Sequence, residues 1–364
     1  MIELTAIDLF AGGGGLSEGL KQAGFNVLSA VEMDRNAANT YQANHPSTDL
    51  ISTDIRYVSA DTIKKSLRGR KLDLLAACPP CQGFSSLTHS RKDEDPRNAL
   101  IGEVTRLIKD LAPQTIMIEN VPGIISRGEK YLASFLEELS SMGYYISYSV
   151  LQVADYGVPQ MRKRFVLLAS LSGKIDIPEK THSLQGDKGL NGWKTVRDAI
   201  YNMPESVTLD ECNLYGGLKA CNWHVTRSIS PLTKKRLEFI KPGGSRFELP
   251  DHLRPKCHKG NNSGFSNVYG RMDWDKPSPT ITGGCTTLSK GRFGHPEKMR
   301  TITIREAALL QTFPMNYIFD ASSVDDICKI IGNALPCLFA KKMASACRDN
   351  IIQSVTPMLS ESQI

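Results

Sequence analysis

The first 172 residues alternate short apolar runs with helical patterns, and this alternation restricts the possible fold more than any other feature. The runs expected to be buried strands are residues 4–10, 25–34, 71–78 and 114–121. Strands that alternate with helices form a mostly parallel sheet with helices on both faces. The sequence therefore predicts an α/β fold with a doubly wound, mostly parallel sheet, which residues 144–153 and 164–170 close as an antiparallel pair.

The pattern changes after Ser172. Residues 173–300 are rich in Gly, Asn, Ser and Pro, which favours loops over regular elements. Helical periodicity returns after residue 300, and the last helical segment has an apolar stripe that needs a sheet to cover. We therefore expect a first domain at 1–172, a smaller loop-rich domain at 173–300, and a segment at 301–364 that returns to the first domain.

Charge is unevenly distributed along the chain. Residues 173–300 hold 21 Lys and Arg against 13 Asp and Glu, a net charge of +8, whereas the whole chain carries +6. A basic segment on a nearly neutral body favours a polyanionic partner that binds to that segment. The alternative is a solvated surface that is basic without binding a polyanion.

Composition excludes several classes of protein. No apolar run reaches the roughly 20 residues that cross a bilayer, and no secretory signal precedes the first strand. The nine cysteines are scattered, which favours reduced thiols in a cytoplasm over a disulfide framework. We expect neither a membrane partner nor a metal site.

A glycine-rich turn, "DLFAGGGG" at residues 8–15, follows the first strand. In a doubly wound sheet this turn binds the ligand. The dinucleotide pattern G-x-G-x-x-G does not fit, because Ser17 and Glu18 occupy the places for its last glycine. Glu32 and Asp54 follow the next two strands and could accept hydrogen bonds from a nucleoside. Adenosine recognition without a pyrophosphate loop favours S-adenosylmethionine over NAD.

Two cysteines, Cys78 and Cys81, stand in "CPPCQ" where another buried strand ends. This spacing suits a redox dithiol, half of a zinc site, or one nucleophilic thiol with an idle neighbour. Zinc would need a second pair of ligands with suitable spacing, which the chain does not offer. Glu119 ends the next strand at the same edge of the sheet, where a carboxyl group can act as a general acid.

A further polar motif, "PQMRKRF", follows at residues 159–165. If this segment is extended, Gln160, Arg162 and Arg164 point to one face. Two arginines on one face can hold a carboxylate, a phosphate or a base carbonyl.

Several of these motifs occur together in one order. They are "DLFAGGGG", "VEMD", "TDI", "CPPCQGFS", "IENVPG", "PQMRKRF", "IREAALLQTFP" and "GNALP". In this order they resemble the DNA (cytosine-5)-methyltransferases of the bacterial type, over most of residues 4–172 and 301–340. The resemblance implies that residues 1–172 form a catalytic, cofactor-binding domain with the S-adenosylmethionine-dependent methyltransferase fold. It also implies that residues 173–300 form a target-recognition domain that reads DNA.

The resemblance also implies the chemistry. Such an enzyme transfers a methyl group from S-adenosylmethionine to C5 of a cytosine that is flipped out of a specific duplex sequence. Cys81 matches the nucleophile that adds to C6, and Glu119 matches the residue that contacts N3 and N4. Arg164 would bind O2, and Arg162 would lie near the thiolate. Cys78 has no role in the motif and is expected to be a small buried residue.

Ten residues are implied to contact the cofactor, whose product is S-adenosylhomocysteine. Phe10 would stack near the adenine, Glu32 would bind the ribose hydroxyls, and Asp54 would meet the adenine. Met33 stands where the family often has an aromatic residue. The complete set is Phe10, Gly12, Gly13, Gly14, Glu32, Met33, Asp54, Ile55, Pro80 and Asn333.

DNA-contacting candidates fall into two segments. The polar segment after Cys81 offers Ser85, Arg91 and Arg97 for backbone contacts. In the basic middle, Arg246, Arg254 and Arg271 are candidates for reading bases, Thr280 for a backbone contact, and Lys234 and Lys235 for phosphate contacts.

The expected partner is double-stranded DNA, bound by a monomer in a bacterial cytoplasm, with a cognate restriction endonuclease acting on the same site. One alternative is a tRNA cytosine-5 methyltransferase of the same chemistry, whose "CFT" signature is reduced here to "GGCTTL". A non-catalytic DNA reader and an NAD oxidoreductase are further alternatives, and both fit the motifs less well.

Overall fold

The computed structural model describes residues 3–80, 96–187, 189–255 and 267–361. Two compact units divide the chain. Unit 1 comprises residues 1–156, 163–180 and 335–364, and unit 2 comprises residues 157–162 and 181–334.

Unit 1 is built on a seven-stranded sheet with the order β3-β2-β1-β4-β5-β7-β6. The strands are β1 (Leu4–Leu9), β2 (Phe25–Val31), β3 (Asp49–Ile51), β4 (Leu74–Ala77), β5 (Thr115–Asn120), β6 (Tyr145–Gln152) and β7 (Lys163–Ser170). Neighbouring strands are parallel from β3 through β2, β1 and β4 to β5. Strand β7 runs antiparallel to both β5 and β6. The predicted mostly parallel sheet and its antiparallel closing pair are confirmed.

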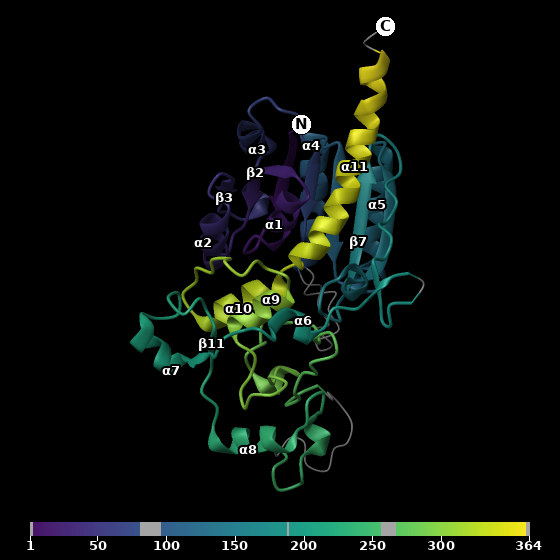
Figure 1. The fold of residues 1–364 in the computed structure, drawn as a ribbon. Helices are drawn as coiled ribbons and strands as arrows, with labels where there is room; N and C mark the ends of the chain where they lie inside the picture. Colours follow the sequence, from purple (N-terminus) through teal and green to yellow (C-terminus); the bar gives the residue numbers. More distant parts are fainter. Residues whose placement is uncertain (1–2, 81–95, 188, 256–266, 362–364) are drawn as a thin grey trace. The chain divides into compact units, whose positions relative to one another are not determined.

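Helices cover both faces of this sheet (Figure 1). The helices of unit 1 are α1 (Gly15–Gln22), α2 (Arg35–Asn44), α3 (Ala60–Leu67), α4 (Leu100–Leu111), α5 (Glu129–Ser141) and α11 (Cys337–Glu361). One apolar core joins the sheet to α3, α4 and α5, and α1 and α11 pack together on the opposite face. Every residue of β1, β4 and β5 is buried, as expected for strands covered on both sides.

A close approach joins α1 to α11. A Cβ atom at Gly19 would lie 2.4 Å from Cβ of Ala340 and 2.7 Å from the carbonyl oxygen of Cys337. Glycine is required there because any side chain would push the two helices apart.

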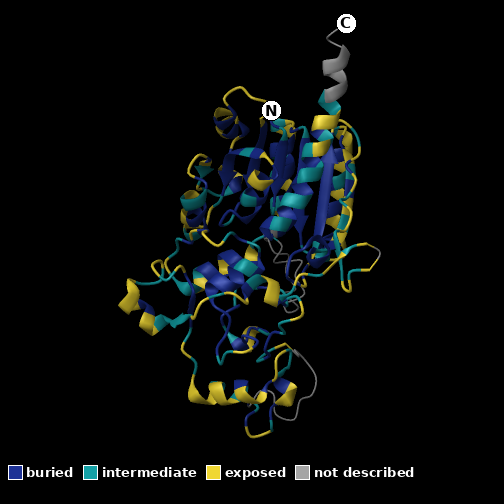
Figure 2. Ribbon diagram, viewed as in Figure 1, coloured by how far each residue is buried: buried dark blue, intermediate teal, exposed yellow. Residues whose placement is uncertain are grey.

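Unit 2 has little regular structure. It contains the helices α6 (Val196–Ile200), α7 (Leu209–Cys212), α8 (Pro231–Phe239), α9 (Ile304–Leu310) and α10 (Val324–Asn333). Its two small sheets pair β8 (His182–Ser183) with β9 (Asn191–Gly192), and β10 (Val207–Thr208) with β11 (Val225–Thr226). Helix α9 of this unit is largely buried, whereas α8 is largely exposed (Figure 2). None of the helices among the described residues is long and apolar enough to cross a membrane.

Candidate active site

The carboxyl ends of the parallel strands lie at one edge of the unit 1 sheet, and the polar residues of the motifs follow these ends. Phe10 leaves β1 with φ +60°, Gly12 has φ +56°, and Gly14 caps α1 with φ +89°. This left-handed backbone explains the glycines at 12 and 14. A Cβ atom at Gly12 would meet nothing within 4 Å, so the turn borders open space.

Glu32, directly after β2, holds this turn. Its Oε2 accepts a hydrogen bond from the Gly12 amide at 2.8 Å, and its Oε1 accepts one from the Asp34 amide at 2.7 Å. Burial raises the pKa of Glu32 above its usual value. Met33 beside it is exposed, so the two neighbours differ sharply in environment.

Asp54 follows β3 and caps the short 3-10 helix η1 (Ile55–Tyr57). Its Oδ1 accepts a hydrogen bond from the Arg56 amide at 3.0 Å, and its Oδ2 lies 2.6 Å from the Arg56 guanidinium. Hydrogen bonding to Arg56 lowers the pKa of Asp54. Ile55 is buried in the core of unit 1, and Phe10 packs against the same core.

Glu119 and Arg164 form an ion pair where β5 and β7 adjoin. Glu119 pairs with Val166 across the two strands, which places Arg164 two residues along on the same face. The Arg164 Nε atom lies 2.5 Å from Glu119 Oε1, and the two side chains are only 13% and 10% exposed. Two of the four predicted catalytic residues are therefore in direct contact.

Cys78 lies beside this pair. β4 and β5 align Ala77 with Ile118, and the Asn120 side-chain amide donates to the Pro79 carbonyl oxygen at 3.3 Å. The alignment continues through Cys78 and Glu119, so their side chains share one face. Cys78 is half-buried rather than fully buried. Burial raises the pKa of its thiol well above the usual value, and the negative charge of Glu119 adds to this effect.

Several predicted residues lie at the limits of the described chain. Cys81, Ser85 and Arg91 are outside the described residues. Arg97 lies in the 3-10 helix η3 (Pro96–Ala99), where the structure describes its backbone but not its side chain. Pro80 is half-buried at the last described position before Cys81.

A polar cluster beneath the glycine-rich turn was not predicted from the sequence. Asp8 of β1 is fully buried, and its Oδ2 accepts a hydrogen bond from the Ser17 hydroxyl of α1 at 2.7 Å. The Ser17 hydroxyl also lies 2.7 Å from that of Tyr41. Asp8 Oδ1 has no hydrogen-bond partner among the described residues, and burial raises the pKa of Asp8 to about 7. The only sequence signal was an acidic residue inside an apolar strand.

Arg162 belongs to unit 2 and is buried there. Its guanidinium donates to the carbonyl oxygens of Ile281 at 2.9 Å and Gly332 at 3.1 Å. Gln160 donates to the Gln311 side chain at 2.8 Å, and its own Oε1 accepts a hydrogen bond from the Ile281 amide. The motif residues 160 and 162 thus tie together distant segments of unit 2.

The remaining residues predicted for unit 2 have varied environments. Thr280 donates its hydroxyl to the Met161 carbonyl oxygen at 2.8 Å. Asn333 ends α10 and is exposed. Arg254 pairs with Asp251 and donates to the Leu249 carbonyl oxygen.

Arg246 and Arg271 are buried, contrary to what surface base readers would require. Arg271 Nη1 donates to the carbonyl oxygens of Leu237 and Ile240, and its Nε donates to that of His295. Arg246 stacks on the Phe247 ring at 4.4 Å. These contacts favour a structural role for both arginines.

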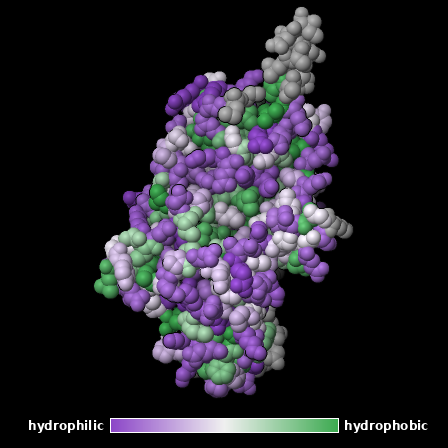
Figure 3. All heavy atoms as spheres, viewed as in Figure 1, coloured by the Kyte–Doolittle hydropathy of each residue, from purple (hydrophilic) through white to green (hydrophobic). Residues whose placement is uncertain are grey.

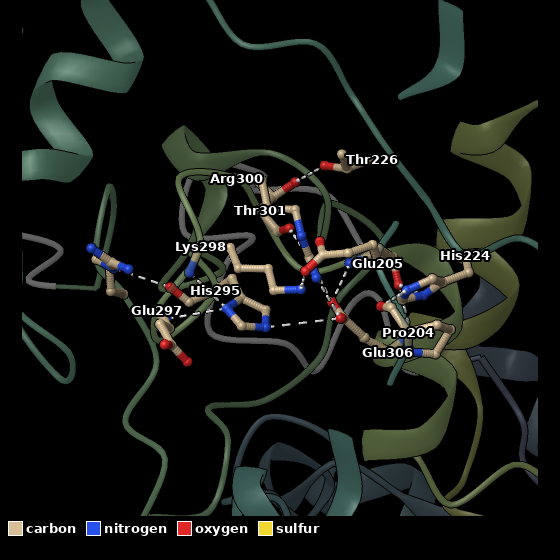
Figure 4. A network of polar contacts seen from close by, with 12 residues as sticks. Pro204, Glu205, His224, Thr226, His295, Glu297, Lys298, Arg300, Thr301 and Glu306 are labelled. Carbon is tan, nitrogen blue, oxygen red and sulfur yellow. Dashed lines mark hydrogen bonds and ion pairs between the residues drawn. The ribbon is translucent and has the colours of Figure 1, made fainter. Parts of the chain in front are cut away.

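A buried ionic network lies in unit 2 (Figure 4). Arg300 donates two hydrogen bonds of 2.8 Å to the carboxylate of Glu306. Burial opposes the charged form of Glu306, but Arg300 outweighs it and lowers the pKa. His295 Nε2 lies 3.9 Å from Glu306, and its Nδ1 accepts from the amides of Glu297 and Lys298. Burial lowers the pKa of His295 to about 4.

No group of three or more His, Cys, Asp or Glu residues in the described part of the chain could hold a metal ion. The seven cysteines described are all free thiols.

Comparison with known proteins agrees with the motif order. The family model for C-5 cytosine-specific DNA methylase matches residues 4–349. The Type II methylase M.HgiDII of Herpetosiphon aurantiacus is 35% identical over 94% of both chains. The Type II methyltransferase M1.HphI of Haemophilus parahaemolyticus is 34% identical over 95% of this chain and 87% of its own.

Solved structures show the same architecture. A prophage-encoded E. coli protein described as a DNA modification methyltransferase has a TM-score of 0.71 and 26% identity, covering 96% of this chain and 100% of its own. The S. pombe Dnmt2 methyltransferase has a TM-score of 0.65 and 19% identity, covering 96% and 99%. The second likeness concerns the fold alone.

Proposed function

The chain belongs to the C-5 cytosine-specific DNA methylase family and is a DNA (cytosine-5)-methyltransferase, and we propose that it works through a covalent adduct. In this proposal Cys81 adds to C6 of a cytosine that has been flipped out of a specific duplex sequence. S-adenosylmethionine supplies the methyl group that C5 receives.

Covalent addition to C6 is needed to make C5 of cytosine reactive. C5 of cytosine is not nucleophilic enough to accept a methyl group directly. Addition of the Cys81 thiolate to C6 converts the ring to an enamine with electron density at C5. After methylation, a base removes the C5 proton, and the bond between sulfur and C6 breaks to release the thiolate.

The observation that carries the proposal is the contact between Glu119 and Arg164. Their ion pair lies at the ends of β5 and β7, beside the strand β4 that leads into Cys81. A carboxyl group here can share a proton with N3 and accept from N4, while an adjacent guanidinium binds O2. Arg164 then does two things, because it orients Glu119 and contacts the base.

Arg162 is proposed to lie near the thiolate and help keep it ionised. Its guanidinium donates to two carbonyl oxygens, which would hold its charge in one place.

The strand ends of unit 1 fit an adenosine-containing cofactor. Open space borders the turn at Gly12, and the carboxylate of Glu32 is oriented by two backbone amides. We propose that Glu32 binds the ribose hydroxyls and that Asp54, with Ile55, meets the adenine. Phe10, Gly13, Gly14, Met33, Pro80 and Asn333 complete the proposed set.

Unit 1 is proposed to carry the chemistry, and unit 2 to select the DNA sequence. The Type II relatives support a restriction-modification role with a partner endonuclease. We further propose that the protein acts as a monomer in a bacterial cytoplasm.

The test is methyl transfer from labelled S-adenosylmethionine to duplex DNA and, separately, to tRNA. Transfer to duplex DNA at C5 of cytosine, located by bisulfite sequencing, supports the proposal. Transfer to tRNA alone would contradict it and favour the RNA alternative. The Cys81→Ala variant should transfer nothing, while binding of S-adenosylhomocysteine confirms that it is folded.

A further inference from the structure

Nine of the 19 Lys and Arg residues in the described part of unit 2 form ion pairs with neighbouring acids. The basic residues in ion pairs are Lys194, Arg197, Lys219, Arg227, Arg254, Lys276, Lys298, Arg300 and Lys329. Paired charges attract a polyanion weakly, because the acid repels what the base attracts. The overall composition of this segment therefore does not reveal where a polyanion binds.

The exposed lysines without an ion pair are few within the described part of unit 2. They are Lys234, Lys235, Lys241 and Lys290. Three of these four belong to α8 or to the turn that follows it. Glu238 is the only acidic residue between positions 231 and 241, so this short segment has a net positive charge.

Helix α8 is firmly anchored from beneath. Leu237 is buried, and Ile240 belongs to a small core with Leu249 and Leu253. Arg236 donates to the Leu253 carbonyl oxygen at 2.7 Å, and the Arg271 guanidinium donates to the carbonyl oxygens at the helix end. Sites built on well-supported elements hold their side chains more accurately than sites on loops.

The outer face of α8 is solvent-exposed (Figure 2). Leu232 and Phe239 are 47% and 52% exposed, and with Lys235 they follow the helical spacing i, i+3, i+7 along one stripe. On the visible face of the protein, hydrophilic residues predominate and apolar ones form smaller groups (Figure 3). Lysines interspersed with isolated apolar side chains suit a phosphate backbone with adjoining sugars and thymine methyl groups.

We propose that α8 and the turn to Lys241 form a principal phosphate-contacting surface of unit 2, with Lys234, Lys235 and Lys241 binding the backbone of duplex DNA. This inference rests on the proposed function. In this proposal the buried Arg271 has a structural role, because it donates to carbonyl oxygens at the end of the helix that contacts DNA.

The experiment measures duplex binding at several salt concentrations with the full chain. Each phosphate contact contributes about 0.9 to the slope of log K against log salt. The Lys234→Ala/Lys235→Ala variant should therefore lose about 1.8 of the slope. It should weaken binding to specific and unrelated duplexes equally. The Lys234→Arg/Lys235→Arg variant should keep the wild-type slope, because its charge is unchanged.

A matched control exists in unit 1. Lys64 and Lys65 are also adjacent exposed lysines on a short helix, α3, so Lys64→Ala/Lys65→Ala makes the same change in net charge. An unchanged slope in the α8 variant, or an equal loss in the α3 variant, would overturn the inference. If the wild type binds duplex DNA but does not methylate it, the proposed function fails while the α8 surface stands.

Discussion

Units 1 and 2 place their buried charges differently. In unit 1 the acidic side chains Asp8, Glu32 and Glu119 stand on or just after strands and are held by nearby groups of the sheet edge. In unit 2 buried arginines hold loops together by donating to backbone carbonyl oxygens, as Arg162 and Arg271 do. A regular sheet satisfies its own backbone, whereas a loop-rich unit needs side chains to do so.

This difference in buried charge predicts different effects of substitutions in the two units. Glu32 and Glu119 lie at the sheet edge where we propose that the chemistry takes place, whereas Arg162 and Arg271 of unit 2 hold its loops together. Substitutions in unit 1 should therefore impair catalysis most, and those of buried arginines in unit 2 should impair stability most.

The largest effect is expected from Glu119→Gln in unit 1. General acid catalysis contributes roughly 10²- to 10⁴-fold, so single-turnover methyl transfer should slow by about that factor. Affinity for S-adenosylhomocysteine should change little. The matched control is Glu103→Gln, which removes an acid paired with Arg106 on α4 and should leave transfer near the wild-type rate. Near-normal transfer by Glu119→Gln would show that another group serves N3.

The free energy of unfolding should depend on pH through Asp8 of unit 1 and, with the opposite sign, through His295 of unit 2. The pKa of Asp8 is raised from 3.8 to about 7, so the folded protein holds a proton that the unfolded chain releases. The stability from this group is present below about pH 4 and is lost as pH rises to 7, by about 4 kcal/mol. The difference in unfolding free energy between wild type and Asp8→Asn, measured in urea, should grow in the variant's favour over this window. A constant difference would show that Asp8 is ionised when buried.

His295 in unit 2 should behave in the reverse way. Its pKa is lowered from 6.5 to about 4. Between these pH values His295 is protonated in the unfolded chain and neutral in the folded protein. Stability is lost as pH falls from about 6.5 to 4, by about 3 kcal/mol. The His295→Asn variant should show less of this loss in urea unfolding. An equal loss in both proteins would mean that His295 becomes protonated without penalty.

Arg271→Met should have the smallest effect of these. It leaves buried carbonyl oxygens of Leu237 and Ile240 without a donor, which costs about 1–3 kcal/mol. The variant should unfold at lower urea concentration and bind all duplexes less well. If it instead keeps its stability and relaxes the choice of one base pair, Arg271 reads DNA directly and its structural role is wrong.

Sequence patterns predicted unit 1 well for a physical reason. Apolar runs and the glycine-rich turn determine where strands end, and parallel strands gather those ends at one edge. The contact between Glu119 and Arg164 follows from this geometry, although their pairing with each other was not predicted. The half-buried position of Cys78 was also missed, because a cysteine suits both a core and a polar edge.

Unit 2 was less predictable from its sequence. An arginine can bury its long stem and donate to carbonyl oxygens, or extend into solvent, and the sequence does not distinguish the two. Arg246 and Arg271 were predicted to read bases, yet both are buried. The sequence gives the net charge of residues 173–300, but only the structure shows which of their lysines form no ion pair.

The measurement that tests the central claim most directly uses a target duplex whose cytosine carries fluorine at C5. Fluorine cannot leave as a cation, so elimination stops after methylation and Cys81 stays bonded to C6. With S-adenosylmethionine present, we expect a complex that survives denaturing electrophoresis in the wild type and in Cys78→Ala, but not in Cys81→Ala. Absence of this complex from wild-type protein that methylates ordinary duplex under the same conditions would contradict covalent catalysis through Cys81.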